Sequence, residues 1–140
     1  MTSAIKTPWH LWAVGLATLL FNAVGVYSYL MTQTGSLADL GMTADQIAYF
    51  DSFPAWADMV WALGVWGAFA GSILLLLRRR LAFAAFAVAT IGLIGTTYFE
   101  LVVTEIPADL QNPALMAAIW ISTLFSLWYA RRMGAVGVLR

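Results

Sequence analysis

Four long apolar stretches dominate the chain, and short polar segments separate them. Each reaches about 20 residues, if the entrance of the last one is included, and a helix of that length crosses roughly 30 Å of hydrocarbon. Strands are excluded because apolar and polar positions do not alternate, and an open sheet in lipid would leave backbone groups unpaired. We therefore predict an all-α fold: an integral membrane four-helix bundle that forms a single domain over residues 1–140. The predicted spans are about 9–31, 54–77, 81–103 and 113–130.

Polar residues mark several helix starts. Thr7-Pro8 and Asn112-Pro113 each place a capping side chain before a proline at the first helical position, where the missing N–H costs nothing. Ser52, two residues before Pro54, is expected to serve the second span in the same way, though less cleanly.

The segment 32–53 is the one substantial connection between spans. Within it Thr43 and Gln46 have the spacing of a capping box, which predicts a short amphipathic helix with Ile47 and Phe50 on one face. Two interpretations stay open: this helix closes the outer mouth of the bundle, or it acts as a substrate lid or a docking element.

The charges orient the predicted bundle. Basic residues occur only before the first span, between the second and third, and after the fourth, and the acidic residues occur in or beside the other connections. Because positive charge favours the cytoplasmic side, we expect an N-in/C-in topology with cytoplasmic termini. The basic positions are Lys6, Arg78, Arg79, Arg80, Arg131, Arg132 and Arg140; the acidic ones are Asp39, Asp45, Asp51, Asp58, Glu100, Glu105 and Asp109.

Composition supports the membrane assignment. Hydrophobic residues make up 62% of the chain and charged residues only 10%, against about 25% in soluble domains. The net charge is zero and no basic run exceeds three arginines, so nucleic acid is not an expected partner. The expected partner is the lipid bilayer.

Small residues follow helical spacing in three of the spans. In the first, Gly15, Thr18, Asn22, Gly25 and Tyr29 recur every three or four residues on one face. Such a face packs against another helix in lipid, with Asn22 donating a hydrogen bond across; alternatively Asn22 lines a polar cavity. Glycines that predict close helix approach elsewhere are Gly64, Gly67, Gly71 and Gly92. The face that carries Asp58 lies roughly 120° from the glycines of its own span, so the two faces are expected to meet different neighbours.

Two carboxylates fall within the spans, near the outer boundary. Asp58 and Glu100 lie at similar depth, and a charged residue within a span is a functional-site hypothesis. If the two lie close together they form a proton-coupled site; the alternative is two separate acids wetted at the interface. Together with Asn22, Thr96 and Thr97 they form the candidate polar site.

The sequence contains no residue pattern typical of a metal site, a haem site or a known catalytic motif. There is no cysteine and a single histidine, His10, so no metal site or haem ligation is expected within one chain. No phosphate loop, nucleophile elbow or zinc-protease motif occurs. We therefore expect neither a cofactor nor enzymatic activity.

Several short stretches resemble a family of small uncharacterised four-span bacterial inner-membrane proteins, some of which carry the label "sugar transporter". These stretches are residues 7–12, 31–34, 49–54 and 61–67, with Gly71-Ser72 ahead of the arginines. The resemblance covers about the first 80 residues and implies a bacterial inner membrane. It implies no functional residues.

Two functions remain open from the sequence. The first is a small-solute or proton-coupled transporter with a polar site in its outer half, expected to be a homo-oligomer because four helices leave little room for a closed pathway. The second is a non-catalytic accessory or assembly subunit of a larger membrane complex.

Overall fold

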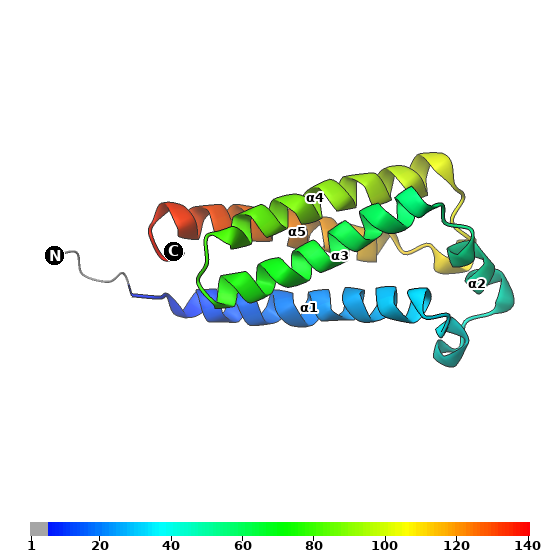
Figure 1. The fold of residues 1–140 in the computed structure, drawn as a ribbon, viewed down its shortest axis with the longest axis horizontal. Coiled ribbons are helices and arrows are strands. Elements are labelled where there is room, and N and C mark those ends of the chain that lie inside the picture. The colour runs from blue at the N-terminus through cyan, green and yellow to red at the C-terminus, as the bar shows by residue number, and fades with distance from the viewer. Residues whose placement is uncertain (1–5) are drawn as a thin grey trace.

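The computed structural model describes residues 6–140, which form a bundle of four long helices (Figure 1). Each helix is long and apolar enough to cross a membrane, the third of them together with the turn that extends it, and no strand occurs in this part of the chain. The predicted all-α four-helix membrane bundle is thus confirmed. The helices are α1 (Trp9–Gln33), α3 (Ala55–Leu76), α4 (Leu81–Tyr98) with a π-helical turn (Phe99–Val103), and α5 (Pro113–Ala135).

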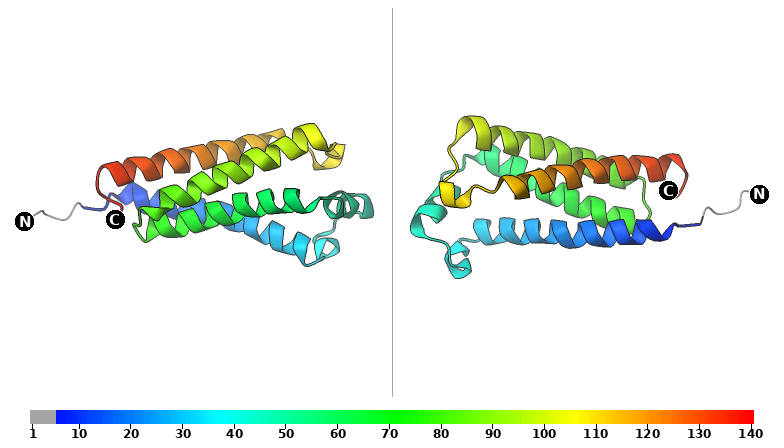
Figure 2. Two further views of the ribbon diagram at one scale, coloured as in Figure 1. Left: turned by 45° about the horizontal axis from the view of Figure 1, so that its top comes forward. Right: turned by 180° about the vertical axis from the view of Figure 1, so that it is seen from behind.

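Three short helices lie together at one end of the bundle, around α2 (Figure 1). They are a 3₁₀ turn (Leu37–Leu40), α2 (Ala44–Asp51) and a second 3₁₀ turn (Ala108–Leu110). All the acidic residues lie at or near this end, which we call the acidic end. The start of α1, the α3–α4 turn and the end of α5 lie at the opposite, basic end (Figure 2).

Two of the predicted helix starts are confirmed. Thr43 and Gln46 form the capping box of α2, with a Thr43 N–H to Gln46 Oε1 distance of 2.9 Å. Asn112 caps α5 by accepting from the Leu115 N–H at 3.0 Å, with Pro113 at the first helical position. The chain therefore enters α2 and α5 at fixed positions beside the cavity described below.

The predicted caps at the other two starts are wrong. No side chain caps α1 or α3, whose capping positions are Pro8 and Pro54. Thr7 instead accepts a hydrogen bond from the Arg78 guanidinium at 2.9 Å. A long arginine side chain from the neighbouring turn competes successfully for that hydroxyl, an interaction that local spacing does not encode. The last helix also continues past its predicted end at 130, because Arg131 and Arg132 are good helix formers even though they end the apolar run.

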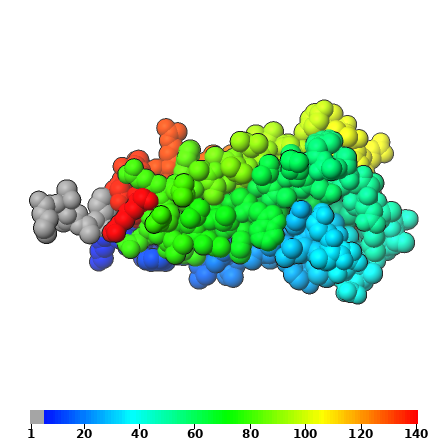
Figure 3. Space-filling view, viewed as in Figure 1, coloured from blue at the N-terminus to red at the C-terminus, as the bar shows by residue number. Residues whose placement is uncertain are grey.

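Helix α3 is the central element, with α1 on one face and α4 on another, while α5 packs on α4. The α3–α4 contact is a seam of small residues. A Cβ added at Gly67 would lie 3.0 Å from the Ala89 backbone nitrogen, and one added at Gly92 would collide with the backbone at Gly64 and Val60. Gly71 makes room for the Phe86 ring. Seen from the side drawn in Figure 1, α1, α3 and α4 form a continuous surface in the space-filling view (Figure 3).

The small-residue stripe of α1 lies along the second face of α3. A Cβ at Gly15 would meet Leu76, and Gly25 lies against Val65. Ser72 donates to Thr18 at 3.1 Å at the centre of this contact. The expected division of α3 into two faces is observed: its glycines meet α4, and the face bearing Ser72 meets α1.

A dense core closes the basic end. Leu11, Leu75 and Phe86 are fully buried there, together with side chains of α5 and of the segment 136–140. That segment folds across the α3–α4 turn, where the Arg140 N–H donates to the Arg78 carbonyl at 2.8 Å and the Arg80 N–H donates to the Arg140 carbonyl at 2.9 Å. The basic half is therefore packed and closed, in contrast to the acidic half.

Candidate ligand-binding cavity

A cavity of about 420 Å³ occupies the bundle between its middle and its acidic end. All four long helices line it, and α2 together with residues 106–112 completes its wall. It exists because α1 packs on α3 and α5 packs on α4, while α1 and α5 face one another across the open space. Most of its lining side chains are apolar, with a few polar groups between them.

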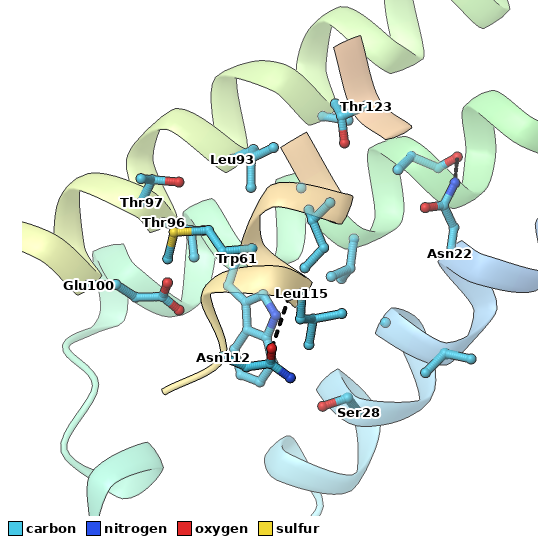
Figure 4. Close-up of a pocket in the computed structure, with 18 of the residues that line it drawn as sticks. Asn22, Ser28, Trp61, Leu93, Thr96, Thr97, Glu100, Asn112, Leu115 and Thr123 are labelled. Atoms are coloured by element: carbon cyan, nitrogen blue, oxygen red, sulfur yellow. Dashed lines mark hydrogen bonds between the residues drawn. The ribbon is translucent and has the colours of Figure 1, made fainter. Parts of the chain in front are cut away.

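The one carboxylate on the lining is Glu100, which points into the cavity from its acidic end (Figure 4). Glu100 lies in the π-helical turn, where the Thr104 N–H donates to the Phe99 carbonyl at 3.0 Å across five residues. A π turn inserts extra backbone into a helix and changes the direction of its side chains, and such turns recur at functional sites. Here the wider turn carries a half-buried acid at the wall of an apolar space.

Asn22 faces the cavity from the opposite side, near the middle of the bundle (Figure 4). Its amide NH₂ donates to the Ala68 carbonyl at 3.1 Å and to the Ser72 hydroxyl at 3.0 Å. Both interpretations of Asn22 therefore describe the structure: it links α1 to α3, and it also lines the cavity. Because the two donors are used, its carbonyl oxygen is the polar group left for the cavity.

Thr96 and Thr97 of α4 bring two hydroxyls to the wall of the cavity that carries Glu100. Thr97 accepts a hydrogen bond from the Trp120 indole at 3.0 Å, which ties α4 to α5. Asn112 adds its amide from the start of α5, where its carbonyl is already engaged as the helix cap.

Aromatic side chains line the acidic end of the cavity. Phe50 from α2 stacks on Trp61 from α3 with ring centroids 6.0 Å apart, and Tyr29 meets the same indole edge-on at 5.0 Å. Helix α2 is held in place by Gln46, which donates to the Asp109 carboxylate at 2.8 Å. Helix α2 thus lies at the mouth of the cavity, where the sequence predicted an element that closes the mouth or acts as a lid.

Tyr49, beside Phe50 on α2, has an unusual hydroxyl. Its oxygen is buried and has no hydrogen-bond partner among the described residues. Burial, and secondarily the negative charge of Glu100, raises the pKa of Tyr49 to about 12. The phenol therefore stays protonated at neutral pH, with a buried hydroxyl that lacks a hydrogen-bond partner among the described residues.

The structure brings four of the five candidate polar residues to this cavity, namely Asn22, Thr96, Thr97 and Glu100. It does not bring Asp58 there. The Asp58 carboxylate accepts a hydrogen bond from the Gln33 amide at 3.3 Å, on the side of α3 that meets α1. The two acids share a depth along the bundle but not a site, because the face of α3 that carries Asp58 is turned away from α4.

Other polar and aromatic residues of the lining did not emerge as candidates from the sequence. They include Ser28, Tyr49, Trp61, Asn112 and Thr123. A signal existed on α5, where Asn112, Met116, Ile119 and Thr123 follow one helical face. The roles of Tyr49 and Trp61 depend on how α2 folds over the bundle, which no local pattern gives.

Metal binding finds no geometric support in the described residues: within 6–140, no three histidine or acidic side chains gather. Comparison with known proteins gives no match to a family model, to a curated protein or to a solved structure. The function must therefore be argued from the cavity itself.

Proposed function

We propose that this protein is a membrane transporter of small solutes, with the cavity as its binding site. The single observation that carries the proposal is the half-buried Glu100 facing an apolar cavity of about 420 Å³ between membrane-spanning helices. Small-molecule sites have volumes of roughly 300–1,000 Å³ and a mostly apolar lining with few polar groups. An acid on such a wall is costly in lipid and is retained where it contacts a solute or a proton.

The packing supports a transport cycle. The cavity is closed toward the basic end by the core around Leu75 and Phe86, so a solute bound there reaches only one side of the membrane in this state. Alternating access would require α1 and α3 to move relative to α4 and α5, the two helix pairs that line the cavity. Such a movement would open the basic end and close the acidic end.

We place the protein in a bacterial inner membrane, with the basic end in the cytoplasm. The separation of basic and acidic residues between the two ends supports this orientation. In it the cavity belongs to the outer half of the membrane and binds solute from outside the cytoplasm.

The test is uptake into proteoliposomes that contain the purified full chain. Vesicles are incubated with a mixed extract of cellular metabolites, washed, and their contents are identified by mass spectrometry. We expect at least one solute to accumulate above the level in protein-free vesicles. Gly25→Leu should abolish the uptake, because Gly25 lies on the cavity wall, where an added Cβ makes only ordinary contact with Val65 and the longer side chain would occupy the cavity.

Gly134→Leu is the matched control, since Gly134 lies in α5 near the basic end with open space around it. Uptake should survive this change. Equal contents in protein-containing and empty vesicles, or equal uptake by the Gly25→Leu variant, would contradict the proposal. A stoichiometric protein that co-purifies in mild detergent, in the absence of any uptake, would favour an accessory subunit instead.

A further inference from the structure

The cavity lining holds a single charged residue, and that residue is acidic. Glu100 is its only acidic residue, and no lysine, arginine or histidine is among the lining residues. A solute with a negative charge would therefore meet a like charge and no counterion. A solute with a positive charge would provide the partner that Glu100 lacks in the cavity wall.

The surroundings of Glu100 favour an organic cation over a small ion. The aromatic residues Phe50 and Trp61 line the same end of the cavity and form a stacked pair. Aromatic faces attract cations, and the attraction is strongest where water is excluded. The remaining length of the cavity is mainly apolar, with Leu93 and Leu115 on its walls (Figure 4), and fits a hydrocarbon or aromatic body.

The unpartnered hydroxyl of Tyr49 distinguishes among cations. A buried polar group without a partner is costly, and binding that supplies one recovers the lost interaction. An ammonium group with N–H bonds can donate to a phenol oxygen as well as to a carboxylate. A quaternary ammonium has no N–H and can satisfy neither by hydrogen bonding.

We propose that the cavity selects a protonated primary or secondary amine with an apolar body, whose ammonium group binds between Glu100 and Tyr49. The proposal rests on the cavity being the solute site of the proposed transporter, and it names the class of solute. Sugars fit this lining poorly, because a polyhydroxylated body would leave many of its hydroxyls against apolar walls.

The test is calorimetric titration of the full chain in lipid nanodiscs at neutral pH, with empty nanodiscs as the blank for partition into lipid. Four probes share one body: 3-phenylpropylamine, 3-phenylpropan-1-ol, 3-phenylpropionate and trimethyl(3-phenylpropyl)ammonium. We expect the amine to bind about tenfold or more tightly than the alcohol, the gain of a charge-assisted hydrogen bond. The carboxylate should bind most weakly, and the quaternary cation should bind less tightly than the amine.

Two variants, with a third as their control, identify the residues that cause the preference. Glu100→Gln should bring the amine and the alcohol to within about threefold of each other, since a neutral amide gives no charge assistance. Glu105→Gln is the control, an exposed acid of the same end that is not on the lining, and should keep the full preference. Tyr49→Phe should narrow the gap between the amine and the quaternary cation.

Equal affinity of amine and alcohol in the unmodified protein would overturn the proposal while leaving the cavity as a solute site. Tighter binding of the carboxylate than of the amine would also overturn the proposal and leave the cavity as a solute site. Failure of all four probes to bind would also overturn it, and the uptake experiment decides the transport function separately. Because the comparison of the four probes needs only the unmodified chain, it does not depend on how well a variant folds.

Discussion

The two halves of this bundle are built differently from the same helices. Toward the basic end, side chains of α1, α3, α4 and α5 meet in one core, and residues 136–140 cover it. Toward the acidic end, α1 and α5 stay apart around a cavity that α2 covers with aromatic rings. A long apolar segment is therefore enough to form a membrane-spanning helix. The placement of small and polar residues decides which part of the bundle contains a cavity.

The largest expected difference between the halves comes from matched leucines. Leu75→Ala removes a fully buried side chain from the core and should lower the free energy of unfolding by about 3 kcal/mol. Leu93→Ala removes a side chain that already borders empty space, so its cost should be about 1 kcal/mol. Reversible unfolding in mixed micelles measures both, and equal losses would mean that the two halves are equally packed.

A second comparison uses glycines on the seam and on the cavity wall. Gly92→Ala should cost about 1–3 kcal/mol, because its new methyl group would collide with backbone atoms of α3 that cannot move independently. Gly25→Ala meets only Val65, at 3.5 Å, and should be neutral or slightly stabilising through better helix propensity. The same unfolding assay applies; a destabilised Gly25→Ala variant would show that the wall at α1 is tighter than described.

A third comparison uses one tyrosine from each half. Tyr129 has its hydroxyl hydrogen-bonded to His10, so Tyr129→Phe should cost about 1 kcal/mol. Tyr49→Phe removes a hydroxyl without a partner and should leave stability at neutral pH unchanged or raise it. Stability after Tyr49→Phe that falls as much as after Tyr129→Phe would mean that the Tyr49 hydroxyl has a partner after all.

The Tyr49 phenol also makes a pH-dependent prediction. Its folded-state pKa, about 12, is above its ordinary value of 10.0, so the unfolded chain loses this proton first as the pH rises. The corresponding stability is present below the ordinary pKa and is lost as the pH rises toward about 12. Tyr49→Phe should therefore make the alkaline loss of stability shallower, and the difference in phenolate absorbance between the two proteins should have its midpoint near 12.

The sequence predicted the fold well because hydropathy alone identifies helices in lipid. The four spans, the capping box at Thr43 and the cap at Asn112 follow from local chemistry. The small-residue faces of α1 and α3 also follow from helical spacing, since a stripe without large side chains has to meet another helix closely.

The residues that line the cavity were harder to predict, because the cavity forms where two helices, α1 and α5, do not pack against each other. Similar depth along the bundle made Asp58 a possible partner of Glu100, but the rotation of α3 about its axis turns Asp58 away from the cavity. Tyr49 reaches the cavity only because α2 folds back over the bundle end, where Phe50 of α2 also stacks on Trp61 of α3. Glu100 lies in a π turn that no sequence rule anticipates. These are tertiary choices, set by packing across the whole molecule.

The most direct test of the central claim, an accessible cavity in one half and a closed core in the other, uses the absence of native cysteine. Single variants Thr96→Cys and Ser126→Cys replace one hydroxyl on the cavity wall and one buried near the core with a thiol. Each is treated in intact membranes with the small reagent 2-aminoethyl methanethiosulfonate, and modification is read by mass spectrometry. We predict that the Thr96→Cys protein reacts while folded and that the Ser126→Cys protein reacts only after denaturation. A protected thiol at 96, or equal reaction at both positions, would contradict the account.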